Sequence, residues 1–582
     1  MTARLVLHLS GAWTEGLDGL LEDGDILYRM PRLLAVSQRD GWQDLPQSLQ
    51  GDMGTLRDQY LGLFAGLEDR LASLPFASLV NDQFIYGVLP VASALTEIAG
   101  IIESRRPSQI LLFHAPERAT HIPATGIVTL ESRRGSRDVL GSLIASSVKA
   151  GVSNLPVVSH KLRGDALSRG WTRRAALRVA SLIILLRFVF TMLRSDLGRK
   201  MAKDRDGIRG LALVRSVEQA RHAARVFSNS EDVGALITPQ FTQDSSAEIR
   251  TRLEGHLPLF VPKASSLLRS LFRALAPTPR TGLNKTQQIT CGPFVFTASL
   301  TELERDFNAV RFYAFQNSLL RDTLRIFPSA RFTAGFEVQG PFAWTEGCIP
   351  RGAGLTTRTI QPVLVQDRPL PVFPFSDYFL ADSAPNRAAL AHIGGVRLGA
   401  IAFKGPPFEV LEVRTPRPSM ALGYFTQPYE TQNNVAIAET LCRVAESHGW
   451  TVILRLHPRE DGVQFEPVLE RYSGICTIGE AEPLEQFLDT VDVSITRTSS
   501  VTKEAIARGC PCVTILLSDL DRLVQADYIR ENGQTLPHVV TDLDAMASRV
   551  CDPVRLKETS IQLQGRLFNG RGFPEFVEFL SR

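Results

Sequence analysis

Residues 421–512 contain three short apolar runs, and each run is followed by a polar or proline-bearing turn and then by a helical pattern. The runs lie at 422–425, 451–456 and 491–496. Short apolar runs that alternate with helices are typical of buried parallel strands in α/β domains. The carboxyl ends of such strands meet at one edge of the sheet, where ligands bind. The sequence therefore predicts an α/β domain whose ligand site is built from the turns after these runs.

The turns supply groups that can bind an anion. The first run ends at Thr426-Gln427-Pro428, the second at His457-Pro458, and the third at Arg497-Thr498-Ser499-Ser500. Hydroxyl and imidazole groups donate to phosphate oxygens, and the start of a following helix adds a positive partial charge. A His-Pro pair also occurs in loops without a ligand, and hydroxyls before a helix also cap it. Together the three turns favour a nucleotide-phosphate site.

Glu504 lies one turn into the helix after the third run, where its carboxylate could accept a hydrogen bond from a ribose hydroxyl. The alternative is a solvated helical glutamate. The chain has no Gly-x-Gly-x-x-Gly sequence and no Walker lysine motif, so neither a nicotinamide cofactor nor an ATP phosphate loop is indicated. No cofactor is expected other than a nucleotide-linked substrate.

The N-terminal part also has α/β character. Residues 1–100 have a mainly helical pattern, and apolar strand-like runs follow at 109–113, 155–158, 210–215 and 233–238. Prolines at 406, 407, 416 and 418 mark a linker. The predicted architecture is therefore α/β, with two Rossmann-like domains facing across a cleft and helical insertions in the first. The domain boundaries are 1–410 and 411–570, and 571–582 form a C-terminal helix that packs back toward the hinge.

Two residues of the N-terminal domain follow predicted strands at the ligand edge. His114 ends the run 109–113, and it is a candidate for the acceptor side; a histidine satisfied within its own loop is the alternative. Glu337 ends the strand predicted at 330–337 and supplies a carboxylate there. Either group could act in proton transfer if a substrate binds at this edge.

Two segments are basic and apolar at once. The predicted insertion at about 161–205 holds a 15-residue apolar run, Val179 to Leu193, which Arg187 interrupts. This run is too short to cross a membrane, which needs about 20 residues. A basic helix with a wide apolar face can instead lie among lipid headgroups. We expect peripheral membrane contact through 173–194 and 263–275; a helix buried between domains is the alternative.

Composition narrows the partners and the compartment. The net charge of the 582-residue chain is +3, which does not indicate a nucleic-acid-binding protein. Its seven cysteines are scattered and odd in number, which argues against a disulfide framework, and Cys510-Pro-Cys512 fits small buried residues better than a metal site. No signal peptide is apparent at the N-terminus. We therefore expect a cytoplasmic protein, with a possible peripheral position at the inner face of the cytoplasmic membrane.

The C-terminal motifs resemble the donor half of bacterial two-domain glycosyltransferases of the GT-B fold. The matching features are strands that end in Gln-Pro, His-Pro and Thr-Ser-Ser, together with Pro483-Leu-Glu485 and the stretch 503–511. Among these enzymes the pattern is closest to sialyltransferases and polysialyltransferases that use a CMP-activated sugar, and it is similar to capsule Kdo transferases. The resemblance covers about 160 residues.

The resemblance implies roles for individual residues. The nucleotide phosphate would be held by His457, Pro458, Ser499 and Ser500. Gln427, Pro428, Glu485, Thr498 and Glu504 complete the donor-binding candidates. The families place a catalytic acid in the N-terminal domain, and Glu337 is the best substitute here, with His457 assisting the departing phosphate. Gln361, followed by Pro362, stands where related enzymes have Gln-His-Gly, and it is the second acceptor-side candidate.

The expected activity is transfer of a sugar to a surface glycan, a glycolipid or a glycoprotein, as in surface polysaccharide biosynthesis. The donor would be the CMP ester of a nonulosonic, sialic-acid-like or Kdo-type acid. No metal ion is expected, because helix dipoles and hydrogen bonds can stabilise the leaving phosphate. The alternatives are a glycerophosphotransferase that uses CDP-glycerol or CDP-ribitol, and a non-catalytic glycan-binding or scaffold protein of an export assembly.

Overall fold

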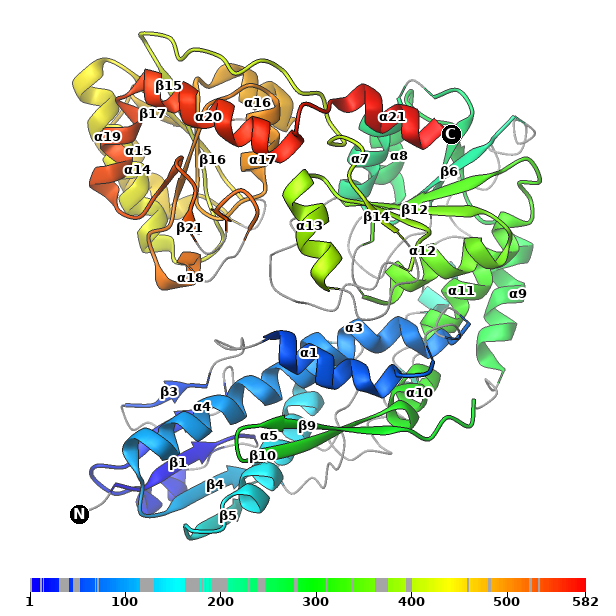
Figure 1. Ribbon diagram of the computed structural model, residues 1–582, viewed down its shortest axis with the longest axis vertical. Coiled ribbons are helices and arrows are strands. Elements are labelled where there is room, and N and C mark those ends of the chain that lie inside the picture. Colours follow the sequence, from blue (N-terminus) through cyan, green and yellow to red (C-terminus); the bar gives the residue numbers. More distant parts are fainter. Residues whose placement is uncertain are drawn as a thin grey trace. The chain divides into compact units, whose positions relative to one another are not determined.

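The computed structural model divides into two compact units by its internal contacts (Figure 1). The first unit comprises 1–359, 369–378 and 393–400, and the second comprises 360–368, 379–392 and 401–582. The structure describes residues 3–10, 13, 15–30, 41–45, 53–67, 70, 73–115, 130–162, 178–179, 182–183, 185–187, 189–190, 207–228, 230–237, 246–276, 281–309, 311–337, 340–361, 375–393, 400–457, 460–479, 483–522, 526–531 and 534–581.

The first sheet of the first unit lies within residues 5–161 and has the order β3-β2-β1-β4-β5. Its strands are all parallel: β1 (Leu5–His8), β2 (Ile26–Arg29), β3 (Gln43–Asp44), β4 (Ile110–His114) and β5 (Val157–Lys161). The surrounding helices are η1 (Glu15–Leu20), α1 (Met53–Leu61), η2 (Gly62–Phe64), η3 (Pro75–Leu79), α3 (Val80–Gln83), η4 (Phe84–Val88), α4 (Leu89–Arg105) and α5 (Leu130–Gly151).

This sheet corrects the mainly helical prediction for residues 1–100. Helices do occupy most of 53–105, but three strands precede them. The side chains of β1 are all buried, so the strand shows no alternation of apolar and polar residues. A continuous apolar run of four residues carries no periodicity that separates a strand from a helix.

The second sheet of the first unit has the order β14-β13-β12-β11-β6-β7-β8. Its strands are β6 (Gly210–Val214), β7 (Val233–Ile237), β8 (Leu259–Phe260), β11 (Phe332–Gly335), β12 (Thr356–Ile360), β13 (Tyr378–Leu380) and β14 (Ala400–Ala402). The helices of this region are α7 (Val217–Phe227), α8 (Ser246–Leu253), α9 (Ala264–Leu275), α10 (Leu300–Ala309), α11 (Arg311–Leu324) and α12 (Gly340–Gly352). Helix α13 (Ala384–Ile393) lies almost entirely within 379–392, which belongs to the second unit. The antiparallel hairpin of β9 (Thr286–Cys291) and β10 (Phe294–Ser299) packs on α1 and α5.

The second unit is built on a six-stranded parallel sheet with the order β17-β16-β15-β18-β19-β22. Its strands are β15 (Ala421–Phe425), β16 (Thr451–Arg455), β17 (Cys476–Ile478), β18 (Val493–Thr496), β19 (Cys512–Ile515) and β22 (Val539–Val540). The other elements are α14 (Thr431–His448), η7 (Val463–Phe465), α15 (Glu466–Arg471), α16 (Leu484–Thr490), α17 (Val501–Ala507), α18 (Asp519–Arg522), β20 (Arg530–Glu531), β21 (Gln534–Thr535), α19 (Leu543–Val550), α20 (Pro553–Phe568) and α21 (Phe573–Ser581). The strands predicted within 421–512 are therefore confirmed.

All three sheets follow one topological rule. Numbered by their place in the chain, the strands of each sheet begin in the order 3-2-1-4-5. This is the order of Rossmann-like domains, in which the crevice between strands 1 and 4 binds the ligand. The predicted α/β fold with Rossmann-like parallel sheets is confirmed, and the first unit contains two such sheets.

The C-terminal helix was predicted to pack back toward the hinge. Helix α21 belongs to the second unit, where the Lys404 ammonium lies 5.0 Å from the centre of the Phe579 ring. A Cβ atom at Gly405 would lie 2.3 Å from the carbonyl oxygen of Gly572. Helix α21 thus packs next to the proline-bearing stretch 406–418. Among the described residues, no helix is both long and apolar enough to cross a membrane.

Candidate functional site

The crevice of the second unit lies between β15 and β18, because these are strands 1 and 4 of its sheet. Ligands of open α/β sheets bind at this position, outside the carboxyl ends of the strands. The turn that begins at Thr426 follows β15, and the turn Arg497–Ser500 follows β18. The structure thus brings together two of the three turns predicted to bind the donor. The third turn, at His457, follows β16, which is the neighbour of β15.

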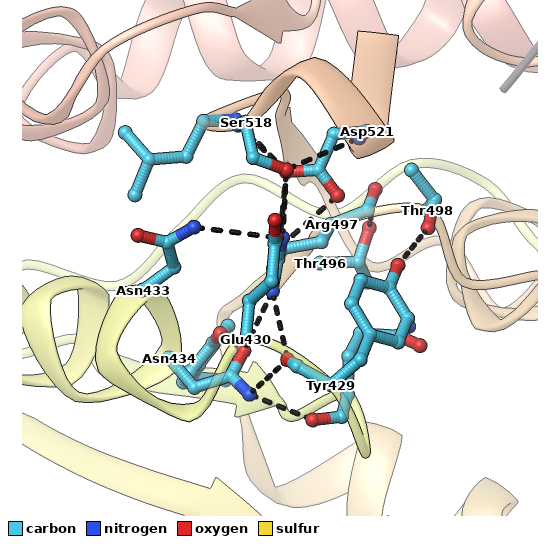
Figure 2. Close-up of polar contacts among 12 residues, drawn as sticks. Tyr429, Glu430, Asn433, Asn434, Thr496, Arg497, Thr498, Ser518 and Asp521 are labelled. Atoms are coloured by element: carbon cyan, nitrogen blue, oxygen red, sulfur yellow. Dashed lines mark hydrogen bonds and ion pairs between the residues drawn. The ribbon is translucent and has the colours of Figure 1, made fainter. Parts of the chain in front are cut away.

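Arg497 is the buried centre of this edge (Figure 2). Its Nη2 atom donates to Asp521 Oδ2 at 3.0 Å, and its Nε atom donates to both carboxylate oxygens of Asp521 at 3.1 and 3.0 Å. It also pairs with Glu430 and donates to the carbonyl oxygen of Tyr429 at 3.2 Å. Asp521 lies beyond β19, so one guanidinium joins the segments that follow three neighbouring strands.

The side chain of Arg497 is therefore not available to bind a phosphate. Both it and the Asp521 side chain are fully buried, and two carboxylates balance its charge. Burial acts to lower the pKa of Arg497, but hydrogen bonding to Asp521 and its charge more than offset this, so the pKa is raised. Arg497 instead fixes the turn that carries the hydroxyl groups.

Thr498 is held from the other side of the crevice. The hydroxyls of Tyr429 and Thr498 lie 2.5 Å apart and share a hydrogen bond, as Figure 2 shows. Burial raises the pKa of Tyr429, so its phenol stays protonated. The Tyr429 ring also lies 4.7 Å from the guanidinium carbon of Arg497. The two turns at the crevice are thus joined both by Arg497 and by this pair of hydroxyls.

The two serines differ in their capping role. Ser500 is the N-cap residue of α17, but its side chain makes no capping hydrogen bond. Ser499 Oγ accepts from the backbone N–H of Val501 at 3.3 Å. The prediction that these hydroxyls cap the helix therefore holds for Ser499 and is wrong for Ser500. Both serines are partly exposed at the crevice.

The first turn is shaped by the start of α14. Gln427 is buried, and its carbonyl oxygen accepts from Asn434 Nδ2 at 2.7 Å. Pro428 is exposed. Glu430 is the N-cap residue of α14 with φ of 49°, and its carboxylate pairs with Arg497. The negative group nearest to this helix start is therefore the chain's own Glu430, which the sequence pattern did not indicate.

Glu460 holds the third turn. Its Oε2 atom accepts from the backbone N–H of His457 at 3.1 Å and from the Thr426 hydroxyl, and its Oε1 atom accepts from Gln464 at 3.1 Å. Its own N–H donates to the His457 carbonyl oxygen at 2.9 Å. The backbone of the half-buried His457 is thus fixed next to the β15 turn. Pro458 lies outside the described residues.

The remaining donor-binding candidates lie on helices that begin at the same edge. Glu485 is in the first turn of α16, which follows β17, and Glu504 is in α17, which follows β18. Both side chains are partly buried. Their positions agree with a site at the carboxyl edge of the sheet.

Lys503 of helix α17 belongs to a second buried ionic cluster. Lys503 Nζ lies 2.9 Å from Asp382 and 2.9 Å from Asp527, and all three side chains are almost fully buried. Burial lowers the pKa of Lys503, but the two carboxylates more than offset this and raise it. Asn386 Nδ2 donates to Asp382 Oδ1 at 2.9 Å. The segment 379–392 is thereby tied to the helix that follows the Ser499–Ser500 turn.

Gln361 belongs to this cluster in the structure. It is buried, and its side-chain oxygen accepts from the backbone N–H of Asp382 at 3.3 Å. Its backbone N–H donates to the Leu380 carbonyl oxygen at 3.1 Å. The contacts given for Gln361 thus fix the segment 379–392, and its acceptor-side role stays a prediction.

In the first unit, Glu337 lies at the crevice of the second sheet. It follows β11, which pairs with β6, and these are strands 4 and 1 of that sheet. Its Oε1 atom accepts from Gln219 Nε2 at 2.7 Å, and Gln219 Oε1 accepts from the Arg215 backbone N–H at 2.8 Å. The sequence prediction of a carboxylate at a strand end is confirmed for Glu337. Its catalytic role stays a prediction.

A buried ion pair supports the Glu337 turn. Arg215 Nε donates to Glu346 Oε1 at 2.8 Å, and both side chains are almost fully buried. Glu346 Oε2 accepts from the backbone N–H groups of Phe336 and Glu337 at 3.1 and 3.2 Å. A Cβ atom at Gly335 would lie 2.3 Å from Glu346 Oε2, so only glycine leaves room for this carboxylate. Sequence reasoning identified none of these supporting residues.

His114 lies on a different sheet from Glu337. It ends β4 of the first sheet, where Nδ1 lies 2.7 Å from the Ala115 carbonyl oxygen and Nε2 lies 3.1 Å from Ser159 Oγ. Burial lowers its pKa, which favours the neutral ring. The two ring nitrogens thus have partners in the residue after β4 and on the neighbouring strand β5, which agrees with a satisfied histidine.

A surface hollow and the Cys510–Cys512 pair lie outside the candidate sites described above. A hollow of about 620 Å³ lies at the amino ends of β7 and β8, opposite the edge that carries Glu337, and is lined by Ser228, Ser230, Glu231, Gly255, His256, Leu257 and Pro258. Across the described part of the chain, no group of three or more His, Cys, Asp or Glu side chains has the spacing of a metal site. Cys510 and Cys512 are both buried and free, as expected for small core residues.

Several solved structures are similar to this chain, whereas no family model and no curated protein matches it significantly. A lipopolysaccharide outer core galactosyltransferase aligns at 11% identity and a TM-score of 0.36, over 64% of this chain and 100% of that one. The pneumococcal O-GlcNAc transferase GtfA aligns at 9% and 0.40, over 64% and 98%. The UDP-GlcNAc 2-epimerase of Neisseria meningitidis aligns at 10% and 0.40, over 64% and 98%.

Proposed function

We propose that this chain is a nucleotide-sugar-dependent glycosyltransferase whose second unit binds the donor at the crevice between β15 and β18. The observation that carries the proposal is the position of Thr498, Ser499 and Ser500. They follow strand 4 of a Rossmann-like sheet, at the point where such sheets bind nucleotides. Their hydroxyls offer donors to phosphate oxygens.

In this proposal the donor phosphate contacts the Thr498–Ser500 turn and the His457 side chain. Arg497 and Glu460 take no part in binding and hold the two turns in place from beneath. Donors fixed before the reaction stabilise a leaving phosphate more effectively than donors that must reorganise. The ion pairs of Arg497 and the hydrogen bonds of Glu460 thus have a positioning role.

Glu337 is the proposed general base that removes the proton of the acceptor hydroxyl. The acceptor hydroxyl would give its proton to the Glu337 carboxylate as its oxygen bonds to the anomeric carbon of the sugar. The bond between that carbon and the phosphate oxygen breaks at the same time, and the nucleotide leaves with both electrons. Gln219, which donates to Glu337 Oε1, would orient the carboxylate.

The donor class we propose is the CMP ester of a nonulosonic or Kdo-type acid, on the resemblance of the strand-end motifs. The acceptor would be a surface glycan, a glycolipid or a glycoprotein. CDP-glycerol is the closest alternative donor, since it shares the same phosphate chemistry. The solved structures named above include complexes with UDP and with UDP-GlcNAc, so uridine nucleotides belong in any test.

The first experiment is a thermal-shift titration of the full chain with CMP, CDP, UDP and GDP. A ligand at 100 times its Kd stabilises the native state by about 2.7 kcal/mol. A unit of roughly 200 residues then melts about 5–11 °C higher. The variant Ser499→Ala/Ser500→Ala should lose this shift, and Ser473→Ala, which precedes β17 at the opposite edge, should keep it. Absence of a shift with all four nucleotides would refute the donor site.

The second experiment tests the base. Glu337→Gln keeps an oxygen that can accept from Gln219, but it cannot take a proton. We expect the nucleotide shift to remain and sugar transfer to fall by about 10²–10⁴-fold, the usual contribution of a general base. Full transfer activity in Glu337→Gln would exclude this role without affecting the donor site.

A further inference from the structure

Helix α9 exposes a row of large apolar side chains. The exposed fractions of Leu268, Phe272 and Leu275 are 45%, 71% and 47%. Spacings of four and three residues place them on one face of the helix. The opposite face, which includes Leu267 and Ala274, is buried, and α9 packs along α11. The exposed row therefore lies on a helix whose other face is packed against the first unit.

A second helical segment exposes a similar row. Residues 178–179, 182–183, 185–187 and 189–190 are helical where the structure describes them. Val179, Ile183, Leu186 and Phe190 are between 50% and 61% exposed, with spacings of four, three and four residues. Leu185 and Val189 of the same segment are buried. This segment thus packs by one face and exposes an apolar face.

Arg311 shows that the two rows adjoin. Its Nη1 atom donates to the carbonyl oxygen of Ala276 at 3.0 Å, directly after α9. Burial and the nearby positive charge of Arg178 lower the pKa of Arg311. Arg178 is one residue before Val179, so the start of the second row lies near the end of α9. The two rows together are called the apolar patch.

Positive charge is concentrated in the two sequence segments that carry the apolar patch. Residues 161–203 and 263–276 together contain fourteen lysines and arginines and two aspartates, a net charge of +12, whereas the whole chain carries +3. Arg178, Arg187, Lys263 and Arg269 are exposed. The rest of the chain is therefore net negative, and the excess positive charge is concentrated on the two segments that carry the apolar patch.

We propose that the apolar patch docks onto an anionic lipid surface. Phe272 and the other exposed side chains would enter the boundary between headgroups and acyl chains, while the arginines reach lipid phosphates. In the proposed contact the patch enters one face of the bilayer; among the described residues no helix is long and apolar enough to span it. A second copy of the chain is a poor occupant, because a symmetric contact would oppose two faces of like charge. This inference goes beyond the proposed function and requires no nucleotide.

The test is flotation of the full chain with vesicles, without nucleotide. Vesicles of phosphatidylcholine with 30% phosphatidylglycerol should bind the wild type, and vesicles of phosphatidylcholine alone should bind it at least tenfold more weakly. Phe272→Asp should weaken binding to the anionic vesicles at least tenfold. The matched control is Val554→Asp on α20, a valine that is 67% exposed outside the patch, and it should bind as the wild type does.

The charge contribution is tested with Arg269→Gln. One positive charge near an anionic surface contributes about fivefold in affinity, equivalent to about 1 kcal/mol. Unchanged melting temperatures would show that each variant is folded. Failure of the wild type to bind anionic vesicles, equal binding to neutral vesicles, or wild-type binding by Phe272→Asp would each overturn the proposal. Conversion of a wild-type oligomer into a monomer by Phe272→Asp, without a loss of vesicle binding, would assign the patch to self-association.

Discussion

Replacement of Arg497 by methionine tests the buried centre of the candidate donor site. Arg497 and Asp521 are both fully buried, so the substitution leaves a carboxylate without its cation in a protein interior. Asp521 would keep two backbone donors, the N–H groups of Leu517 and Ser518 at 3.0 and 3.1 Å. Loss of one partner from a buried ion pair costs about 3–5 kcal/mol. We expect the second unit to lose this amount of stability.

The partner variant Glu430→Gln gives the comparison. The Glu430 side chain is 34% exposed, so solvent screens its pairing with Arg497, and its replacement should cost about 1 kcal/mol or less. Hydrogen exchange of peptides from β15 and β18 measures the stability of the second unit in both variants. The expected decrease in melting temperature is about 6–20 °C for Arg497→Met. Equal losses in the two variants would refute the reasoning, since burial would then not decide the cost.

Three further predictions follow from packing and charge. Gly141→Ala should destabilise the first unit by about 1–3 kcal/mol in urea denaturation, because a Cβ atom there would lie 2.4 Å from the Leu9 carbonyl oxygen. In the same assay Gly100→Ala should stabilise α4 slightly, because a Cβ atom at position 100 would have no atom within 4 Å. Lys503→Met should lower the free energy of unfolding by about 3–5 kcal/mol in the same assay, because two buried aspartates lose their cation. The control Lys557→Met, on α20, should lower it by less than about 1 kcal/mol, because Lys557 makes only an exposed contact. Burial lowers the pKa of His538 to about 3, so between about pH 3 and 6.5 the unfolded chain binds one more proton than the folded chain, and the free energy of unfolding should fall by about 1.4 kcal/mol for each pH unit below 6.5. A His538→Gln variant with the same pH slope as the wild type would contradict this.

The sequence predicted the parts of the second unit that depend on local pattern. Each apolar run between 421 and 512 became a strand, and the polar residues after it lie at the carboxyl edge. The pairs that hold this edge were not predicted, because they join distant residues. Arg497 pairs with Glu430 and Asp521, which are 67 and 24 positions away, and no spacing rule connects them. No role was predicted for Glu460, but its carboxylate fixes the backbone of the His457 turn.

The first three strands of the first sheet were missed for a different reason, whereas β4 and β5 had been predicted as the runs 109–113 and 155–158. Strand β1 has four residues that are all buried, and β3 has only two residues. Strand β1 also pairs with β4 across more than a hundred positions, as between Leu5 and Ile110. The long helices that follow dominate any periodicity in this region. The pattern of residues 1–100 therefore indicated helices and did not mark β1, β2 and β3 as strands.

The second unit is assembled from three separate stretches of the chain, and this has a consequence for its synthesis on the ribosome. Asp382 is made about 120 residues before its partner Lys503. At 5–20 residues per second, that delay is on the order of 6–24 s. During this interval Asp382 lacks the lysine that balances its charge in the folded unit. A fragment that starts at residue 401 would lack Asp382 altogether, so a shortened gene for the donor-binding unit should encode 379–392 as well.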